Sequence, residues 1–375
     1  EESKTILSER RSYMKKDCIE RREKLLSDLP LNSLAVFFAG ELIPSSADAH
    51  YPFVINKNFY YLTHLNEDGL ILLAQHTSSG RKESLFIKDD NPLLEKWIGY
   101  SIKENEALEV SGIKNIMKLS EFENYLTRLF VSNEIKEFYI DSERMTLKQA
   151  QTKADRFTSE IKEAHPDLTI VNLNKRINSM RRIKSEDEIE KMVSAMHVTH
   201  RGLNRILSKL EEGKTEFQMA AEFSYQVQSE NCTHAFDTIA ASGDDACILH
   251  YVDNQKVLKD GDLILLDLGA QYQQYASDIT RTYPVSGKFS DRQKVFYTIV
   301  LKAQEAVIDA IQPGVSFQFL NQIVKEYYKK ACVEAKIIEK EEDIDRVYYH
   351  GVSHSLGLDT HDVGTLEGTK CEEGM

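Results

Sequence analysis

The stretch Asp262–Pro284 reads DLILLDLGAQYQQYASDITRTYP, and the interpretation of the whole chain starts from it. It opens as an apolar strand that nevertheless carries Asp267, turns after Gly269 and returns through Asp278. An unpaired carboxylate in a buried strand costs several kcal/mol or takes up a proton. Two carboxylates that face each other across a hairpin also repel, unless a cation lies between them. This stretch therefore predicts half of a metal site.

The composition argues against some classes of binding partner. The chain has 375 residues, which suggests two domains. Its 47 Lys and Arg residues against 60 Asp and Glu residues give a formal net charge of −13, which argues against a nucleic-acid or anionic-membrane surface. The sequence has no apolar run long enough to span a membrane, and its first residues lack an apolar signal core. We therefore expect no nucleic-acid partner, no membrane partner and a cytoplasmic location.

The cysteines predict free thiols. Their number is odd and no CxxC pair occurs, which disfavours both a disulfide framework and a thiolate zinc site. Scattered free thiols are typical of a reducing compartment. The cysteines are Cys18, Cys232, Cys247, Cys332 and Cys371.

The N-terminal half, residues 1–174, alternates strand and helix patterns, which predicts an α/β domain. The predicted strands are Leu34–Ala39, Phe59–Thr63, Leu70–Ala74, Leu85–Lys88, Ile135–Ile140 and Leu168–Leu173. The predicted helices are Ser120–Val131 and Thr146–Ala164.

The second half, residues 175–375, follows a polar, basic connector. A capping box at Ser185 and Glu188 precedes a long helix, whose apolar stripe includes Ile189, Leu203 and Ile206. Further helices are predicted to begin near Thr215, Ser290 and Ser316. Long amphipathic helices beside apolar hairpins predict an α+β domain in which helices flank a curved antiparallel sheet.

Histidines supply the other half of the predicted site. His250 closes an apolar segment, and the stretch Tyr349–Gly364 (YHGVSHSLGLDTHDVG) holds His350, His354 and His361. A single histidine on an apolar strand is more often a satisfied core residue than a ligand. Several histidines together with two aspartates on facing strands indicate a metal site instead. Carboxylate and imidazole donors suit Mn, Co, Zn or Fe, and a set rich in carboxylates favours Mn²⁺.

The spacing of His350 and His354 is that of a helical zinc pair. Gly351 and Gly357 disfavour a helix in this segment, so we do not interpret the two histidines as such a pair.

Taken together, several motifs resemble one family over essentially the whole chain. They are LLDLGAQYQQYASDITRTYP, HGVSHSLGLDTHDVG, GDDACILHY, RRIKSEDEIEKM and YPFVINKNFYYLTHLNED. The chain resembles the M24 metallopeptidases of the pita-bread fold, most closely the Xaa-Pro aminopeptidases (aminopeptidase P) and next the Xaa-Pro dipeptidases (prolidases). The resemblance implies a creatinase/aminopeptidase P-like N-terminal domain over residues 1–174 and a pita-bread metallopeptidase domain over residues 175–375.

The resemblance also implies the metal ligands. Asp267 and Asp278 match two metal-binding aspartates, the second of which bridges two divalent ions, and His354 matches the histidine ligand. We expect Mn²⁺, with Co²⁺ or Zn²⁺ as alternatives. In the two-metal scheme a hydroxide between the ions attacks the peptide carbonyl.

The remaining histidines are implied to act on the substrate. His250 and His361 match residues that contact substrate and stabilise the tetrahedral intermediate, and His350 matches a further histidine that lines the site. The expected substrates are peptides with proline at the second position, cleaved before that proline. A homodimer is expected by analogy with the family.

The resemblance departs at the C-terminal end. It implies two further ligands, both glutamates downstream of the HDVG motif, whereas the sequence stops at Met375. We therefore expect the second domain to be truncated. A chain without these glutamates is expected to bind metal weakly and to be inactive. Three other functions stay open, namely an Xaa-Pro dipeptidase, a non-catalytic peptidase-like binding protein and a creatinase-like, metal-independent hydrolase.

Overall fold

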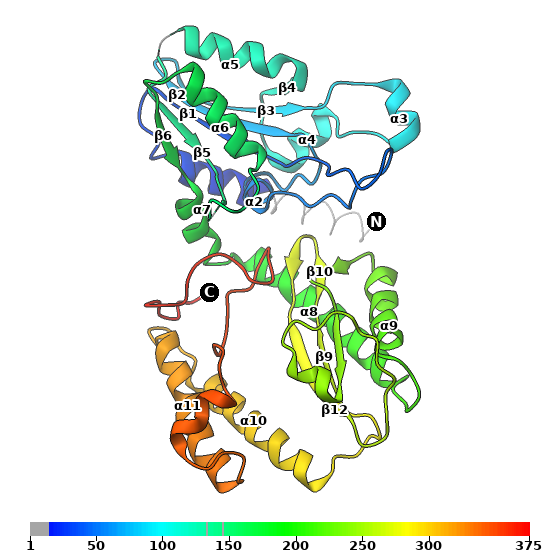
Figure 1. Ribbon diagram of the computed structural model, residues 1–375. Helices are drawn as coiled ribbons and strands as arrows, with labels where there is room; N and C mark the ends of the chain where they lie inside the picture. The colour runs from blue at the N-terminus through cyan, green and yellow to red at the C-terminus, as the bar shows by residue number, and fades with distance from the viewer. Residues whose placement is uncertain (1–14, 133, 145) are drawn as a thin grey trace. The chain divides into compact units, whose positions relative to one another are not determined.

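The structure is a computed structural model that describes residues 15–132, 134–144 and 146–375. The chain forms two compact units, and the boundary between them lies between Met180 and Arg181 (Figure 1). Among the described residues, no helix combines the length and apolar character that a membrane crossing requires.

The first unit is built on a six-stranded mixed sheet in the order β4-β3-β2-β1-β5-β6. The central pairs β1–β2 and β2–β3 are antiparallel, whereas β3–β4, β1–β5 and β5–β6 are parallel. The strands are β1 (Ser33–Phe38), β2 (Ile71–Thr77), β3 (Gly80–Ile87), β4 (Ile116–Lys118), β5 (Glu137–Ile140) and β6 (Thr169–Asn172).

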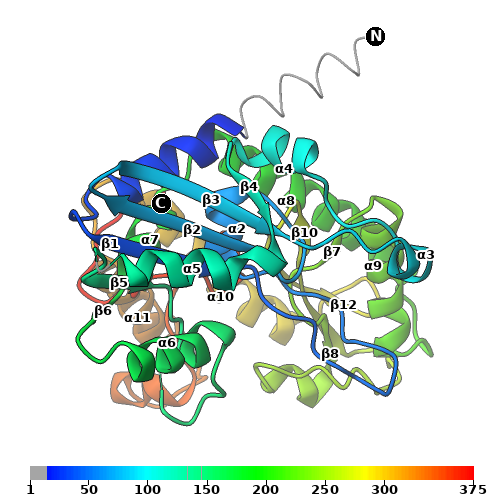
Figure 2. The ribbon, with the colours of Figure 1, turned by 90° about the horizontal axis from the view of Figure 1, so that it is seen from above.

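Helices cover this sheet, as an α/β domain requires. Figure 2 shows α5 (Phe122–Val131) and α6 (Lys153–Ala164) lying across one face of it. Phe122 and Ile161 from these helices pack with Phe138 of β5 in one buried cluster. The other helices of this unit are the one described over residues 15–26, α2 (Lys57–Thr63), α3 (Pro92–Ile98), α4 (Glu104–Ser111), the short 3₁₀ helix η1 (Leu119–Glu121) and α7 (Asn174–Arg181), which ends at the unit boundary.

The prediction of a strand over Phe59–Thr63 is wrong, because this segment is part of helix α2. The side chain of Asn56 accepts a hydrogen bond from the backbone N–H of Phe59 at 2.8 Å and so caps the helix. His64, with φ 55°, ends it in the left-handed conformation. The aromatic run FYYLT favours a strand by propensity, but capping and burial of its residues outweigh that preference.

Two other boundaries differ from the sequence prediction. Helix α6 begins after Thr152, whose hydroxyl accepts from the N–H of Asp155, rather than at Thr146. The segment interpreted as a connector contains helix α7.

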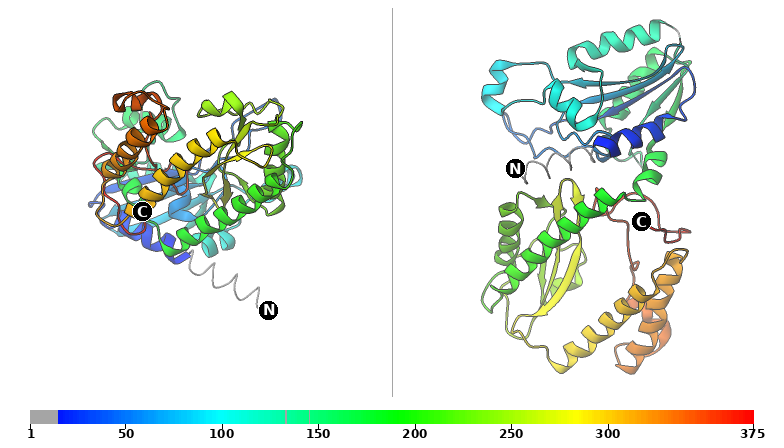
Figure 3. Two further views of the ribbon diagram at one scale, coloured as in Figure 1. Left: turned by 90° about the horizontal axis from the view of Figure 1, so that it is seen from below. Right: turned by 180° about the vertical axis from the view of Figure 1, so that it is seen from behind.

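The second unit packs a three-stranded antiparallel sheet, in the order β12-β9-β8, against two helices. Ile264, Leu266 and Leu268 alternate along β9 and bury their side chains against the helices. The right-hand view of Figure 3 shows α8 running along one face of this sheet. The elements are α8 (Glu186–Leu207), α9 (Glu216–Ser229), β8 (Ile239–Ser242), β9 (Leu263–Leu268) and β12 (Ile279–Pro284).

Beyond this sheet, β7 (Thr233–His234), β10 (Ala270–Tyr272) and β11 (Tyr275–Ala276) form a second small sheet, and η2 (Gly243–Cys247) follows β8. The capping box at Ser185 and Glu188 is confirmed, and so is the start of α9 after Thr215. The predicted stripe of α8 is wrong at Ile189, which is 42% exposed. The buried positions of that turn are Glu188 and Lys191.

Helices α10 (Asp291–Ala310) and α11 (Phe317–Glu334) begin after Ser290 and Ser316, as predicted. They pack on each other and on η3 (Glu341–Arg346) through a separate buried cluster that includes Val307 of α10.

The predicted turn after Gly269 is wrong, because β9 and β10 lie on one arm of the hairpin and the chain turns at Gln273 and Gln274, whose φ angles are 48° and 70°. The link between β9 and β10 nevertheless requires glycine. Leu268 pairs with Ile279 and Gln271 pairs with Ala276 in one continuous register, so Gly269 lies opposite Asp278. A Cβ atom on Gly269 would lie 1.9 Å from the carbonyl oxygen of Ser277. Since real Cβ contacts are never that short and the obstacle is backbone, this position admits no side chain without moving the hairpin.

We predict that Gly269→Ala destabilises the second unit by about 3 kcal/mol, because the added methyl group overpacks a backbone contact. The midpoint of urea unfolding checks this. Gly351→Ala is the matched control, since a Cβ there would have its nearest neighbour at 3.9 Å. Equal midpoints for the two variants would contradict the prediction.

Candidate active site

The hairpin places the two aspartates on one face of the sheet. Thr280 lies opposite Asp267 in the β9–β12 ladder, and Asp278 precedes Thr280 by two residues on the same side. Because side chains alternate along a strand, Asp267 and Asp278 point to the same face as diagonal neighbours. That face is opposite to the one that packs on α8 and α9.

The electrostatics of this pair are unfavourable without a cation. Asp267 is half-buried, and the hydroxyl of Thr280 donates to its Oδ1 at 2.8 Å. Burial and the nearby charge of Asp278 nevertheless raise the pKa of Asp267. The fold thus holds the Asp267 carboxyl where its charged form is disfavoured.

His354 brings positive charge to the pair. Its Nε2 lies 3.1 Å from Oδ2 of Asp278, and this hydrogen bond raises the pKa of His354. Its Nδ1 lies 3.0 Å from the carbonyl oxygen of Ser355. With a proton on Nδ1, donated to that carbonyl, Nε2 is the nitrogen that faces Asp278 and has the lone pair that a metal ion would need.

The other histidines extend from this cluster. The ring of His361 meets that of His354 edge-on, with centroids 4.4 Å apart, and the centroids of His250 and His361 are 6.5 Å apart. His250 and His361 are both exposed. The structure therefore brings five of the predicted site residues into one neighbourhood.

His350 has different surroundings. Its ring lies 5.2 Å from that of Tyr348 and 6.2 Å from that of Tyr349, measured between centroids. Its Nδ1 lies 2.8 Å from the carbonyl oxygen of Gly351.

A buried ion pair fixes the segment that carries His354 and His361. Arg181, at the start of the second unit, pairs with Asp362, and both side chains are almost completely buried. A Cβ on Gly357 would lie 2.2 Å from Oδ2 of Asp362, so the segment folds tightly around this carboxylate. The N–H of Ala276 donates to the carbonyl of Gly357 at 2.8 Å, which ties the segment to the hairpin two residues before Asp278.

Comparisons with known proteins agree with this geometry. The family model described as metallopeptidase family M24 matches residues 190–375, and that of the aminopeptidase P N-terminal domain matches residues 18–139. The Xaa-Pro aminopeptidase of Haemophilus influenzae is 31% identical over 360 residues, which cover 94% of this chain and 81% of the relative. The chain belongs to metallopeptidase family M24.

Solved structures of this family support the same conclusion. A structure described as an aminopeptidase P from Bacillus anthracis matches with a TM-score of 0.94 and 40% identity, over 96% of this chain and 86% of that one. The zinc-substituted aminopeptidase P of Escherichia coli in complex with product matches with a TM-score of 0.87 and 29% identity, over 96% and 85% of the two chains. The predicted fold, an α/β N-terminal domain followed by an α+β pita-bread domain, is confirmed, as is a hydrolase of the M24 family.

Membership of the M24 family implies divalent metal ions, and the donors around Asp278 fit them chemically. Two carboxylates and one imidazole are hard to intermediate ligands for such ions. Among the described residues, no three His, Cys, Asp or Glu side chains already converge on one point as a closed metal cage would require. The direct contact is the pairing of His354 with Asp278, with 3.1 Å between Nε2 and Oδ2.

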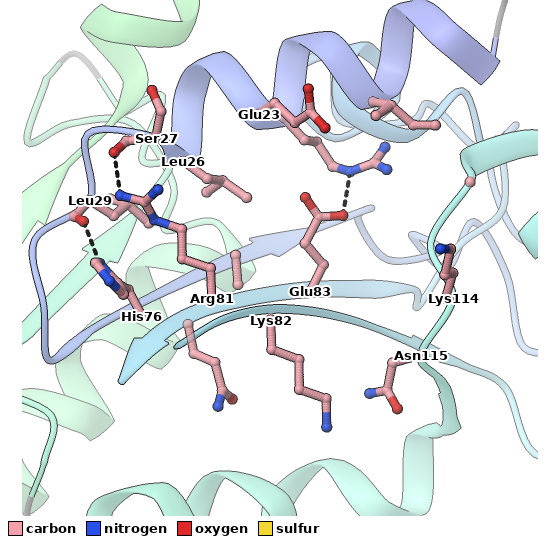
Figure 4. A pocket seen from close by; sticks show the side chains of 15 residues that line it. Glu23, Leu26, Ser27, Leu29, His76, Arg81, Lys82, Glu83, Lys114 and Asn115 are labelled. Carbon is pink, nitrogen blue, oxygen red and sulfur yellow. Dashed lines mark hydrogen bonds and ion pairs between the residues drawn. The ribbon is translucent and has the colours of Figure 1, made fainter. Parts of the chain in front are cut away.

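A separate cavity of about 660 Å³ in the first unit has a different character (Figure 4). It lies beside the helix over residues 15–26 and strands β2 and β3. Arg22 Nε donates to Glu83 Oε2 at 2.9 Å, and His76 Nδ1 lies 2.8 Å from the carbonyl oxygen of Leu29. These polar groups bond within the protein, and the cavity's lining includes no predicted site residue.

Three residues that support the site were not predicted from the sequence, namely Thr280, Arg181 and Asp362. Arg181 lies in a run of basic residues that looks solvated, and its burial depends on a carboxylate far along the chain. Asp362 lies within the HDVG motif, and that motif is the sequence feature that could have identified it.

The raised pKa of Asp267 predicts a pH-dependent effect of Asp267→Asn on the metal-free protein. A carboxyl whose pKa is raised by folding destabilises the fold once it is charged. This penalty is absent below the unfolded pKa of about 3.9 and complete above the folded pKa. Asn keeps the acceptor for Thr280, so the variant should be more stable at pH 8, and its advantage should shrink as the pH falls toward 4.

The midpoint of thermal unfolding, measured between pH 4 and 8, checks this prediction. It should rise by about 2–4 °C for each kcal/mol of stability that the variant gains. The exposed Asp260→Asn serves as control. A stability loss at pH 8, or a gain that does not change with pH, would argue against a repelling pair.

Proposed function

We propose that this M24 protein is a metal-dependent exopeptidase that hydrolyses the Xaa-Pro bond at the N-terminus of peptides. The observation that carries the proposal is the clustering of Asp267, Asp278 and His354 on one sheet face, with His361 in ring contact with His354. The names of the relatives, Xaa-Pro aminopeptidases, support the substrate class.

The proposed roles follow from these positions. Asp267, Asp278 and His354 would hold divalent ions, which when bound polarise the scissile carbonyl and lower the pKa of water. His361 is exposed next to the ligand His354, so a ring N–H can donate to the oxygen of the scissile carbonyl as negative charge develops there. His250 would bind the substrate beside His361, whose ring centroid lies 6.5 Å from its own, and His350 would line the site.

The metal, the location, the domain limits and the substrate complete the proposal. Manganese is favoured by the carboxylate-rich donor set. A cytoplasmic location is consistent with cysteines that are all free. The assignment of residues 1–174 and 175–375 to the two domains, and a homodimer, follow the family resemblance. Peptides with proline at the second position are the proposed substrates, because a proline ring without an N–H can be selected by a shaped apolar recess.

The test uses Asp278→Asn and His354→Ala, made in the full-length protein, on an Xaa-Pro-Xaa tripeptide with Mn²⁺ present. Each should lower kcat/KM by more than about 100-fold, because losing even a group that only supports a metal ligand typically costs 10–100-fold. The thermal midpoint should stay close to that of the unaltered protein. His200→Ala, an exposed histidine on α8, should keep full activity.

Unchanged turnover in Asp278→Asn or His354→Ala would refute the proposal. Turnover of an Xaa-Pro dipeptide that exceeds that of the tripeptide would favour a dipeptidase instead.

A further inference from the structure

We propose that Glu216 is a positioning residue for His250, which it holds over the Asp267 face of the sheet through the hydroxyl of Tyr251. The inference rests on the proposed function in one respect, since His250 is taken to bind the substrate. The proposed effect of Glu216 on His250 is indirect, because it acts through Tyr251.

Glu216 is a fully buried carboxylate in the first turn of α9. Its Oε1 accepts from the N–H of Ser242 at 2.6 Å and from the hydroxyl of Ser242 at 2.7 Å. Its Oε2 accepts from the hydroxyl of Tyr251 and from the N–H of Lys256, both at 2.9 Å. Four donors on two oxygens offset the cost of burying this charge, and hydrogen bonds to an ionised group are the stronger kind.

These four hydrogen bonds hold one segment, residues 243–256, at both of its ends and at a residue inside it. Ser242 is the last residue of β8, immediately before the segment, and Lys256 is its last residue. The backbone N–H of Glu216 also donates to the carbonyl of Lys256 at 2.9 Å, next to a bridge between Thr215 and Val257. Glu216 thus closes the base of the segment and holds Tyr251 within it.

Tyr251 fixes the segment to the face that carries Asp267. Its ring is buried against Ile239, Ala241 and Leu265. Ile239 is the residue directly opposite Asp267 in the β8–β9 ladder, so these side chains share the face of Asp267. Burial, aided by the Glu216 carboxylate, raises the pKa of Tyr251 to about 12, so its hydroxyl remains a donor at neutral pH.

His250 depends on this anchor because little else holds it. It is exposed, and so are its neighbours Ile248, Leu249 and Val252. A side chain on such a segment is ordered only at the cost of conformational entropy. Anchoring the adjacent residue keeps the His250 ring near His361, and a misplacement of about 1 Å in an active site can cost a factor of 10² in rate.

The test variant is Tyr251→Phe, which keeps the packed ring and removes the hydroxyl that donates to Glu216 and also accepts from the N–H of Gln255 at 3.1 Å. In the metal-loaded protein it should lower kcat/KM for the tripeptide about tenfold or more. In a His250→Ala background the same change should have an effect of less than about twofold, because the residue being positioned is gone. Tyr283→Phe, on β12 of the same sheet but on its helix-facing side, is the matched control and should be neutral.

A second measurement does not depend on activity. Amide hydrogen exchange of residues 243–256 in the metal-free protein should become about tenfold faster in Tyr251→Phe and stay unchanged in Tyr283→Phe. Gln255 is left out of this comparison, because its own N–H loses its acceptor in Tyr251→Phe. Exchange elsewhere in the second unit should be unaltered.

The outcomes separate this inference from the proposed function. Equal losses of kcat/KM in the presence and absence of His250, or unchanged exchange of residues 243–256, would overturn the role of Glu216 while leaving peptidase activity established. An unaltered full-length protein that does not hydrolyse Xaa-Pro peptides would refute the proposed function. In that case hydrogen exchange alone would test whether Glu216 anchors the segment through Tyr251. Faster exchange in Tyr251→Phe would support this role, and unchanged exchange would overturn it.

Discussion

The repulsion between Asp267 and Asp278 is the constraint on which the rest of the second unit depends. The β9–β12 ladder forces both carboxylates onto one face, and burial makes the charge of Asp267 harder to accommodate. Gly269 lets the hairpin close opposite Asp278, where any side chain would meet the Ser277 carbonyl. The hydrogen bond to Asp278 raises the pKa of His354 and so favours a positive charge beside this carboxylate. We propose the same atoms as ligands for a divalent ion, whose binding would relieve the unfavourable arrangement of charge.

Two buried carboxylates, Asp362 and Glu216, position histidines near the sheet face that carries Asp267. Asp362 pairs with Arg181 and orders the segment that carries His354 and His361. Glu216 gathers four donors and orders the segment that carries His250. Removing one partner of the Arg181–Asp362 pair is strongly destabilising, because the other charge is left without compensation. Both carboxylates therefore act on the site through packing and hydrogen bonds, and neither needs to touch a substrate.

Much of this could be predicted from local patterns, and the failures have physical causes. The helix starts after Ser185, Thr215, Ser290 and Ser316 were predictable because capping depends on neighbouring residues alone. The FYYLT segment was mispredicted because its propensity favours a strand while a cap and burial, which depend on the tertiary structure, favour a helix. The stripe of α8 failed at Ile189 because the helix there buries Glu188, which accepts from the hydroxyl of Tyr275 at 2.9 Å. The candidate ligands could be named from motifs, whereas Glu216 could not, because its partners lie up to 40 residues away.

The most direct test of the central claim, that a cation belongs between these carboxylates, is anomalous diffraction at the manganese edge from crystals grown with saturating Mn²⁺. The account predicts anomalous density in contact with Asp267 and Asp278, with Nε2 of His354 turned from its proton-mediated contact with Asp278 to the ion. Manganese density only at other side chains, or no density beside Asp267 and Asp278 at saturating Mn²⁺, would contradict it.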